Sequence, residues 1–201
     1  MNIFHREGLF FTSDTHFNHA NIIRFCSRPF ETVEEMNEQL SLRWNEVVAP
    51  DDTVFHLGDF ALGGSAVWTK VLDRLNGKIH LIMGNHDLKN LSQGFMGRFE
   101  EVTMQRYIQV GKVSLYLNHH PFLCFEGGQR DNCWQLFGHV HTCPNNTGVD
   151  VDRLPLLYPT QYDVGVDNND YRPVSFLEVE RRIFRQIEKA GKIIKGCNSE
   201  N

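Results

Sequence analysis

The sequence lacks the features that mark several large classes of protein. None of its apolar runs approaches the ~20 residues that a membrane-spanning helix needs. The first residues, Met1 to Glu7, contain neither the basic segment nor the apolar core of a secretory signal. The chain also lacks the glycine-rich motifs that bind nucleotide phosphates and the G-x-S-x-G motif of serine hydrolases. We therefore expect no membrane association, a cytoplasmic location, and neither hydride transfer nor ATP-driven phosphorylation.

Positive charge and paired cysteines are also scarce. The chain has 20 basic and 25 acidic residues, a formal net charge of −5, and no basic run. Proteins that bind nucleic acid usually set clustered Lys and Arg against the phosphates, so nucleic acid is an alternative partner that the charge does not favour. The five cysteines form no C-x-x-C pair, which predicts free thiols in a reducing compartment.

The remaining composition is that of a globular protein. Of the 201 residues, 41% are hydrophobic and 22% are charged, and at about 150 residues per domain this length favours one domain. We expect residues 1–190 to form that domain and residues 191–201 to form a C-terminal tail. Short apolar runs between turn residues predict strands at Leu9–Ser13, Thr53–Leu57, Ile79–Met83, Val113–Leu117, Gln135–Phe137 and Tyr162–Val166.

Helix signals alternate with the early strands. A capping box from Thr32 to Glu35 predicts a helix with apolar residues from Val33 to Val47 on one face. Ser65 is expected to cap a second helix that carries Leu75 and is ended by Gly77, and Ser175 is expected to cap a third that runs to about Ala190. Asn145–Pro159 is expected to be a long loop. This order of elements predicts an α/β fold.

Each of the first five predicted strands leads directly into potential metal ligands. These groups are Asp14-Thr15-His16, Gly58-Asp59, Gly84-Asn85-His86-Asp87, Asn118-His119-His120-Pro121 and Gly138-His139-Val140-His141. In open α/β sheets, sites form outside the carboxyl ends of the strands. The spacing therefore predicts one site at one sheet edge.

The donor atoms indicate which ions this site would hold. Imidazole nitrogens with carboxylate and amide oxygens suit divalent manganese, our first choice, or iron, nickel, cobalt or zinc. The candidate ligands are too many for one tetrahedral ion and suit two ions about 3.5–4 Å apart. Two such ions would carry more positive charge than Asp14 and Asp59 neutralise. The surplus would attract an anionic substrate and acidify a bridging water, an arrangement suited to in-line attack on phosphorus.

The five groups, in this order, resemble the motifs of the calcineurin-like metallophosphoesterases. The resemblance implies a four-layer αββα sandwich with a binuclear metal site at the carboxyl ends of the strands. It makes Asp14, His16 and His141 ligands of one ion, Asn85, His119 and His139 ligands of the other, and Asp59 the bridge. It makes His86 the general acid or charge stabiliser at the departing oxygen, with Asp87 orienting it. Asp14–Asn21 and Gly165–Pro173 resemble a small bacterial and phage branch without a cap domain.

The activity implied is hydrolysis of small, nucleotide-like phosphomonoesters or phosphodiesters by a metal-bridging hydroxide. A nuclease and a non-catalytic metal-binding module of the same fold are the alternatives.

Other residues near these motifs have weaker signals. His119 and His120 compete for one ligand position, and the spacing to Pro121 in the resemblance favours His119. Asn18, His19 and Arg28 are candidate substrate contacts, since Arg28 could clamp a phosphate and His19 could line the mouth of the site. Substrate specificity is expected in loops such as Glu126–Asn132 and Asn145–Pro159.

Overall fold

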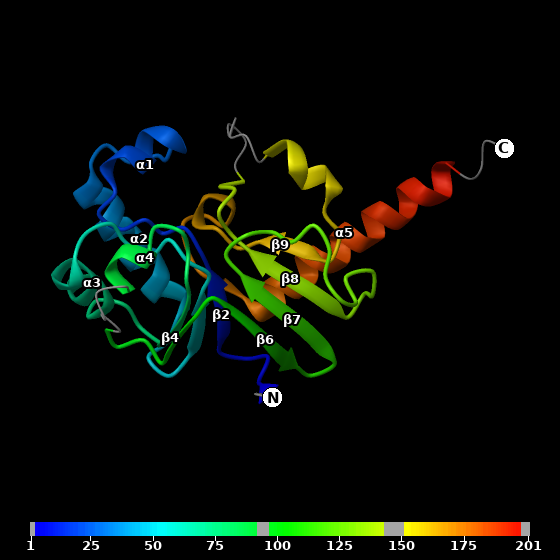
Figure 1. The fold of residues 1–201 in the computed structure, drawn as a ribbon, viewed down its shortest axis with the longest axis horizontal. Helices are drawn as coiled ribbons and strands as arrows, with labels where there is room; N and C mark the ends of the chain where they lie inside the picture. Colours follow the sequence, from blue (N-terminus) through cyan, green and yellow to red (C-terminus); the bar gives the residue numbers. More distant parts are fainter. Residues whose placement is uncertain (1–2, 92–96, 143–150, 198–201) are drawn as a thin grey trace.

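Two five-stranded sheets form the centre of the molecule (Figure 1). The computed structural model describes residues 3–91, 97–142 and 151–197. The first sheet has the strand order β10 (Val174–Ser175), β2 (Leu9–Thr12), β3 (Thr53–His56), β4 (Lys78–Ile82) and β5 (Glu101–Thr103). The second has the order β1 (Ile3–Phe4), β6 (Gln105–Val110), β7 (Val113–Asn118), β8 (Cys133–Phe137) and β9 (Gln161–Asp163).

The parallel strands of both sheets end at the same edge of the molecule. Strands β2 to β5 are parallel to one another, and so are β7 to β9. Just beyond β2, Ser13 forms a parallel bridge with Gly165, which follows β9. This bridge joins the two sheets at their carboxyl edge, where a site is expected.

Helices cover the first sheet on the face away from the second. They are α1 (Ala20–Phe25), α2 (Val33–Val47), α3 (Ser65–Leu72) and the short α4 (Leu88–Leu91), which Figure 1 shows grouped on one side. Met36, Leu40 and Trp44 of α2 and Trp68 of α3 are buried in one apolar cluster with Val54 of β3. Burial of this helix face against the sheet is the main force holding the layer in place.

A second apolar cluster lies between the sheets. Phe11 and Phe55 of the first sheet are buried together with Leu115 and Trp134 of the second. The long helix α5 (Phe176–Cys197) adds Phe176, Val179 and Ile183 to this cluster, and its C-terminal part extends beyond the body (Figure 1). Two 3-10 turns, η1 (Val151–Leu156) and η2 (Val166–Asn168), complete the described elements. The predicted α/β sandwich of two sheets with flanking helices is confirmed.

The N-caps confirm two helix predictions and correct a third. The hydroxyls of Thr32 and Ser175 accept the backbone N–H groups of Glu35 and Glu178. The predicted cap Ser65 is instead the first helical residue of α3, and the N-cap is Gly64, because the Gly64 carbonyl already accepts the N–H groups of Val67 and Trp68.

Two predicted helix ends were misplaced. Helix α3 ends at Leu72, before Gly77. Helix α5 continues past Ala190 to Cys197 and includes Gly191 and Gly196, because each glycine inside a helix costs only about 1 kcal/mol and does not by itself end it.

The remaining differences concern short elements and one loop. Helices α1 and α4 and strands β1, β5, β6 and β10 have no counterpart among the predicted elements. Of the predicted loop Asn145–Pro159, the first residues lie outside the described ones, and residues 151–156 form η1. None of the described helices is long and apolar enough to span a bilayer.

Candidate metal centre

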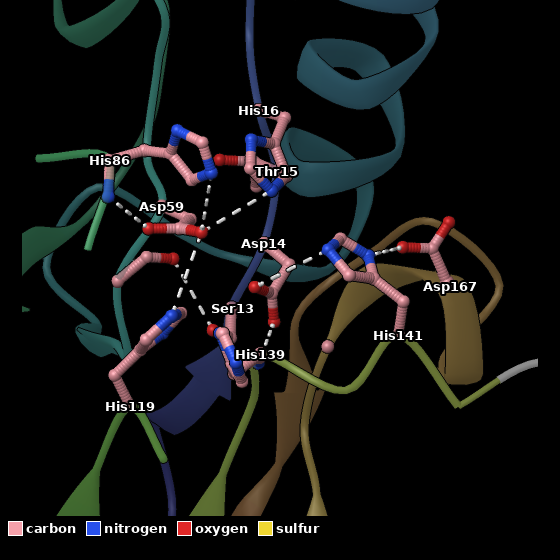
Figure 2. A network of polar contacts seen from close by, with 12 residues as sticks. Ser13, Asp14, Thr15, His16, Asp59, His86, His119, His139, His141 and Asp167 are labelled. Atoms are coloured by element: carbon pink, nitrogen blue, oxygen red, sulfur yellow. Dashed lines mark hydrogen bonds and ion pairs between the residues drawn. The ribbon is translucent and has the colours of Figure 1, made fainter. Parts of the chain in front are cut away.

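The predicted ligands meet at the carboxyl edge of the two sheets (Figure 2). Asp14 and His16 follow β2, Asp59 follows β3, and Asn85 to Asp87 follow β4. From the second sheet, His119 follows β7, and His139 and His141 follow β8. Each sheet therefore supplies part of one cluster of side chains.

Five of these residues have strained backbones. The φ angles are 56° at Asp14, 49° at His16, 57° at Asp59, 71° at His139 and 46° at His141. Left-handed conformations cost non-glycine residues about 1–3 kcal/mol each and persist only where surrounding contacts enforce them. Such strain gathers at functional sites because it aims side chains that regular structure would point elsewhere.

Backbone hydrogen bonds between the loops enforce these conformations. The N–H groups of Asp14 and His16 donate to the carbonyls of Gly58 and Asp59 at 2.9 and 3.0 Å. The N–H of His139 donates to Oδ2 of Asp14 at 2.9 Å, which joins the loops of the two sheets. The fold itself thus holds the ligand loops in register.

Two motif glycines are required by the closeness of these loops. A Cβ atom at Gly84 would overlap Oδ1 of Asp59, and one at Gly138 would overlap Oδ2 of Asp14. Any other residue at either position would push a predicted ligand out of place.

His56 links the loops after β2 and β3 through hydrogen bonds. It is fully buried, and burial lowers its pKa to about 3, so the ring is neutral. Its Nδ1 accepts the N–H of Gly58 at 3.2 Å, so Nε2 carries the proton and donates to the Thr15 hydroxyl at 2.9 Å. Thr15 in turn donates to the carbonyl of Phe60 at 2.8 Å. His56 is therefore a structural residue beneath the site.

The first group of donors contains two buried acceptors without a partner. Oδ1 of Asp14 and Nε2 of His16 have no hydrogen bond, although both residues are buried. Nε2 of His141 lies 3.9 Å from this Oδ1, and the rings of His16 and His141 stack with centroids 5.2 Å apart. Buried polar atoms without partners are rare in proteins. A cation among these three residues would satisfy them.

The second group gathers a carboxamide oxygen and two histidine ring nitrogens. Nδ1 of His119 lies 2.7 Å from the carbonyl oxygen of Leu57, so Nδ1 carries the proton and Nε2 presents a lone pair. This Nε2 lies 3.1 Å from Oδ1 of Asn85, which also lies 3.1 Å from Nδ1 of His139. These three atoms could share a cation as ligands.

Asp59 lies between the two groups. Its Oδ2 is 3.5 Å from Nε2 of His16 and 3.6 Å from Nε2 of His119 (Figure 2). The donor set therefore fits two divalent ions that share Asp59.

Burial sets the protonation states of these groups. It lowers the pKa of His16, with the neighbouring His141 adding to the effect, so the ring keeps a lone pair for a metal. It raises the pKa of Asp59, against the opposing influence of His119. Burial alone would lower the pKa of His141, but the charge of Asp14 and the hydrogen bonds that His141 makes with Asp167 and Cys26 raise it to about 11. Positive charge is thus favoured beside Asp14, which is where a metal ion would supply it.

Arg28 has a different place from the one predicted. Its side chain is buried, and its guanidinium pairs with Asp167 through Nε at 2.8 Å and Nη2 at 2.9 Å. The same guanidinium donates to the backbone carbonyls of Asp14 and Thr15 at 2.7 and 2.9 Å. The prediction that Arg28 contacts the substrate is therefore wrong, because its donors face inward and are already used.

Asp167 is the site residue that the sequence interpretation missed. Its Oδ2 accepts Nδ1 of His141 at 2.8 Å, which fixes the ring and leaves Nε2 toward Asp14. The pair of Arg28 and Asp167 therefore fixes both the His141 ring and the Asp14 carbonyl by hydrogen bonds. The only available signal was the location of Asp167 within Gly165–Pro173, the stretch that resembles a phage-type branch.

The carboxylate of Asp87 has a backbone role instead of the predicted one. Its Oδ2 accepts the N–H groups of Asp59 and Gly84 at 2.8 Å each, and its Oδ1 accepts that of Phe60 at 2.9 Å. Burial raises its pKa to about 6, against these three donors. Asp87 therefore orients the loop that carries Asp59, which corrects the expectation that it orients the His86 ring.

His86 lies at the mouth of the cluster. Its side chain is 49% exposed, its Nε2 is 4.0 Å from Oδ2 of Asp59, and its N–H donates to Oδ1 of Asp59. The half-buried His19 lies beside it, with ring centroids 6.2 Å apart. Asn18 is exposed, and its amide donates to the carbonyl of Leu62 at 3.2 Å. Both His86 and His19 are accessible to a bound phosphate ester.

His119 and His120 are now distinguished by burial. His119 is 1% exposed and faces Asp59 and Asn85, whereas His120 is exposed. The ring of His120 packs on His139 with centroids 4.3 Å apart. This arrangement favours His119 as the ligand.

Comparison with known proteins gives consistent matches. The family model for calcineurin-like phosphoesterases matches residues 9–172. An uncharacterized protein of Methanocaldococcus jannaschii, MJ1445, is 37% identical over 198 residues, covering 94% of this chain and 96% of that one. The gene 66 protein of Mycobacterium phage L5 is 28% identical over 163 residues, covering 68% and 78%. A protein of unknown function from Aquifex aeolicus, AQ665, has a similar solved structure, with a TM-score of 0.64, 26% identity, and coverage of 90% of this chain and 99% of that one.

Proposed function

The chain belongs to the calcineurin-like phosphoesterase family, and from this premise we propose that its carboxyl-edge site binds two divalent ions and hydrolyses esters of phosphate with small organic molecules. The observation that carries the proposal is the position of Asp59, whose Oδ2 lies between the His16 and His119 nitrogens. One carboxylate oxygen shared by two sets of donors is the arrangement that two-metal hydrolases use.

The residues divide into two metal sites. Asp14, His16 and His141 would hold one ion, and Asn85, His119 and His139 the other, with Asp59 shared. When bound, the ions supply the charge that activates water and offsets negative charge on the phosphoryl group. Manganese is the first choice, and iron, nickel, cobalt and zinc suit the same donors.

The protein residues supply orientation and a proton. Asp167 and the Leu57 carbonyl each engage Nδ1 of a ligand histidine, so that Nε2 is directed at the site. His86, exposed at the mouth, is placed to protonate the departing oxygen, and Asp59 holds it by its backbone N–H. Water adds to phosphorus, the P–O bond to the alcohol breaks, and the alcohol leaves with a proton.

A nuclease is the second candidate, and the described surface near the site gives it little support. Among the described residues that line the apolar cavity beside His139, none is Lys or Arg. Arg28, the basic residue closest to the ligands in the hydrogen-bond network, faces inward. Polynucleotide binding relies on basic side chains against phosphates.

The test is hydrolysis of bis-p-nitrophenyl phosphate and p-nitrophenyl phosphate by protein stripped with a chelator. Mn²⁺, Ni²⁺, Zn²⁺ or Mg²⁺ would be returned singly, with Asp59→Asn as the control. Metal-dependent turnover that the control lacks supports the proposal. Binding of two ions without turnover of either ester would support the non-catalytic module instead.

A further inference from the structure

An apolar cavity opens beside the second group of ligands. Its volume is about 420 Å³, within the range of small-molecule sites. It is lined by His120, Pro121, Leu123, His139, Val140, Leu154, Leu156 and Leu157. Six of these residues are apolar, and the two histidines are the predicted ligand His139 and its packing partner His120. The cavity therefore borders the candidate metal centre at His139.

The rim of the cavity exposes apolar surface to solvent. Leu123 is 74% exposed and Leu156 is 67% exposed. Apolar side chains gathered around a concave surface commonly mark a binding site, since a ligand that covers them removes them from water. The lining contains no Asp, Glu, Lys or Arg, and its polar side chains are the two histidines. The part of a ligand that fits here is therefore apolar.

The cavity and His86 border different parts of the site. The rings near His86 are those of His16 and His19, with centroids 5.3 and 6.2 Å away. The rings near His139 are those of His119 and His120, with centroids 5.1 and 4.3 Å away. His86 is absent from the cavity lining. A group that leaves beside His86 is therefore not the group that fills the cavity.

We propose that this cavity binds the organic substituent that stays on phosphorus, which makes the substrate a phosphodiester with one apolar substituent. The inference rests on the proposed function and adds its substrate class. A phosphomonoester has one organic group, which departs, so it would leave the cavity empty. In the diester, water adds to phosphorus, the P–O bond beside His86 breaks, and the departing oxygen takes a proton. The product is a phosphomonoester that still carries the apolar group.

The experiment compares two diesters with the same leaving group. Methyl p-nitrophenyl phosphate and phenyl p-nitrophenyl phosphate both release p-nitrophenol, so they differ in the retained substituent. The kcat/KM ratio, phenyl over methyl, would be measured for the metal-loaded protein and for Leu156→Asp. Leu177→Asp is the matched control, because Leu177 lies on α5 and is 42% exposed.

We expect the ratio to fall about tenfold in Leu156→Asp and to stay unchanged in Leu177→Asp, since a buried aromatic ring contributes about that much binding. The fall should come mainly from KM for the phenyl ester. An unchanged ratio in Leu156→Asp, with the methyl ester still hydrolysed, would overturn the inference and leave the proposed function intact. Leu123→Ser provides a second test should Leu156→Asp lose its folded circular dichroism spectrum.

Absence of any turnover would count against the proposed function and would still leave the cavity testable. Calorimetry would then compare diphenyl phosphate with dimethyl phosphate on the metal-loaded protein. Tighter binding of diphenyl phosphate that Leu156→Asp weakens supports the cavity assignment. Equal binding of the two diesters contradicts it.

Discussion

The two halves of the candidate metal centre are held in different ways. On the Asp14 side, His141 is fixed by Asp167, which is itself fixed by the buried Arg28. On the Asn85 side, His119 is fixed by one backbone carbonyl, and His139 borders an apolar cavity. A buried ion pair therefore supports the first half from inside the protein, whereas the second half borders a cavity that opens toward solvent.

This difference suits the two halves to different roles, retention of an ion in the first and contact with substrate in the second. The clamp of Arg28 and Asp167 holds a histidine and the strained backbone of Asp14 in place, which suits tight retention of an ion. The open half leaves room for substrate beside its ligands. Asp59 belongs to both halves, so its loss should affect the molecule most.

Asp59→Asn should lower kcat/KM for bis-p-nitrophenyl phosphate by about a thousandfold. The amide would keep an acceptor for the His86 N–H but lose the charge that faces His16 and His119. Steady-state rates at saturating Mn²⁺ measure the effect. Asp51→Asn, at a carboxylate whose side chain is 98% exposed, is the control and should retain full activity. Turnover within a few-fold of the parent in Asp59→Asn would contradict a role of Asp59 in both halves, because the two halves would then act independently.

His86→Ala should slow alkyl phosphate esters by about a hundredfold or more, and p-nitrophenyl esters far less. A poor leaving group needs the proton that the exposed His86 ring is placed to give, and p-nitrophenolate does not. Rates on the two kinds of ester, measured at one metal concentration, give the ratio. Equal losses on both would remove His86 from the role of acid.

Asp167→Asn should weaken one ion and spare the other. The substitution removes the charge that orients His141 and pairs with Arg28, and such supporting residues contribute about 10–100-fold to metal affinity. Calorimetric titration of Mn²⁺ into stripped protein would resolve the two affinities. Asp170→Asn, at a side chain that is 77% exposed, serves as the reference. Equal weakening of both ions would show that the clamp supports the whole fold instead of one half.

His120→Ala should leave the metal content nearly unchanged, within about a twofold range of affinity, because an exposed side chain outside the ligand set is removed. His119→Ala should lose one ion. Metal analysis of the two variants, purified and loaded in the same way, distinguishes the neighbours. Loss of an ion in His120→Ala alone would reverse the assignment.

The meeting of these groups at one edge could be predicted because each follows a strand within a few residues. Asp14, Asp59 and His119 all come directly after apolar runs, and the parallel order of those runs brings them to one edge. Local capping patterns likewise predicted the starts of α2 and α5 at Thr32 and Ser175. These features depend on short spacing along the chain.

The supporting residues could not be predicted in the same way. Arg28 and Asp167 are 139 residues apart, and nothing in the local sequence of either indicates the other. An arginine near a phosphate-binding motif reads as a phosphate clamp until the fold shows that it is buried. Asp87 was assigned to its neighbour His86, although its carboxylate in fact turns toward the loop that follows β3. Proximity to His86 along the chain was therefore misleading, because the Asp87 carboxylate binds backbone N–H groups instead.

The most direct test of the two-ion site is to measure bound ions and turnover in one titration. Mn²⁺ would be added stepwise to chelator-stripped protein while bound metal and hydrolysis of bis-p-nitrophenyl phosphate are followed together. We predict that two ions bind per chain and that the rate rises with the second, because Asp59 completes the site only when both halves are filled. Full turnover with one ion per chain, or two bound ions with no hydrolysis, would contradict it.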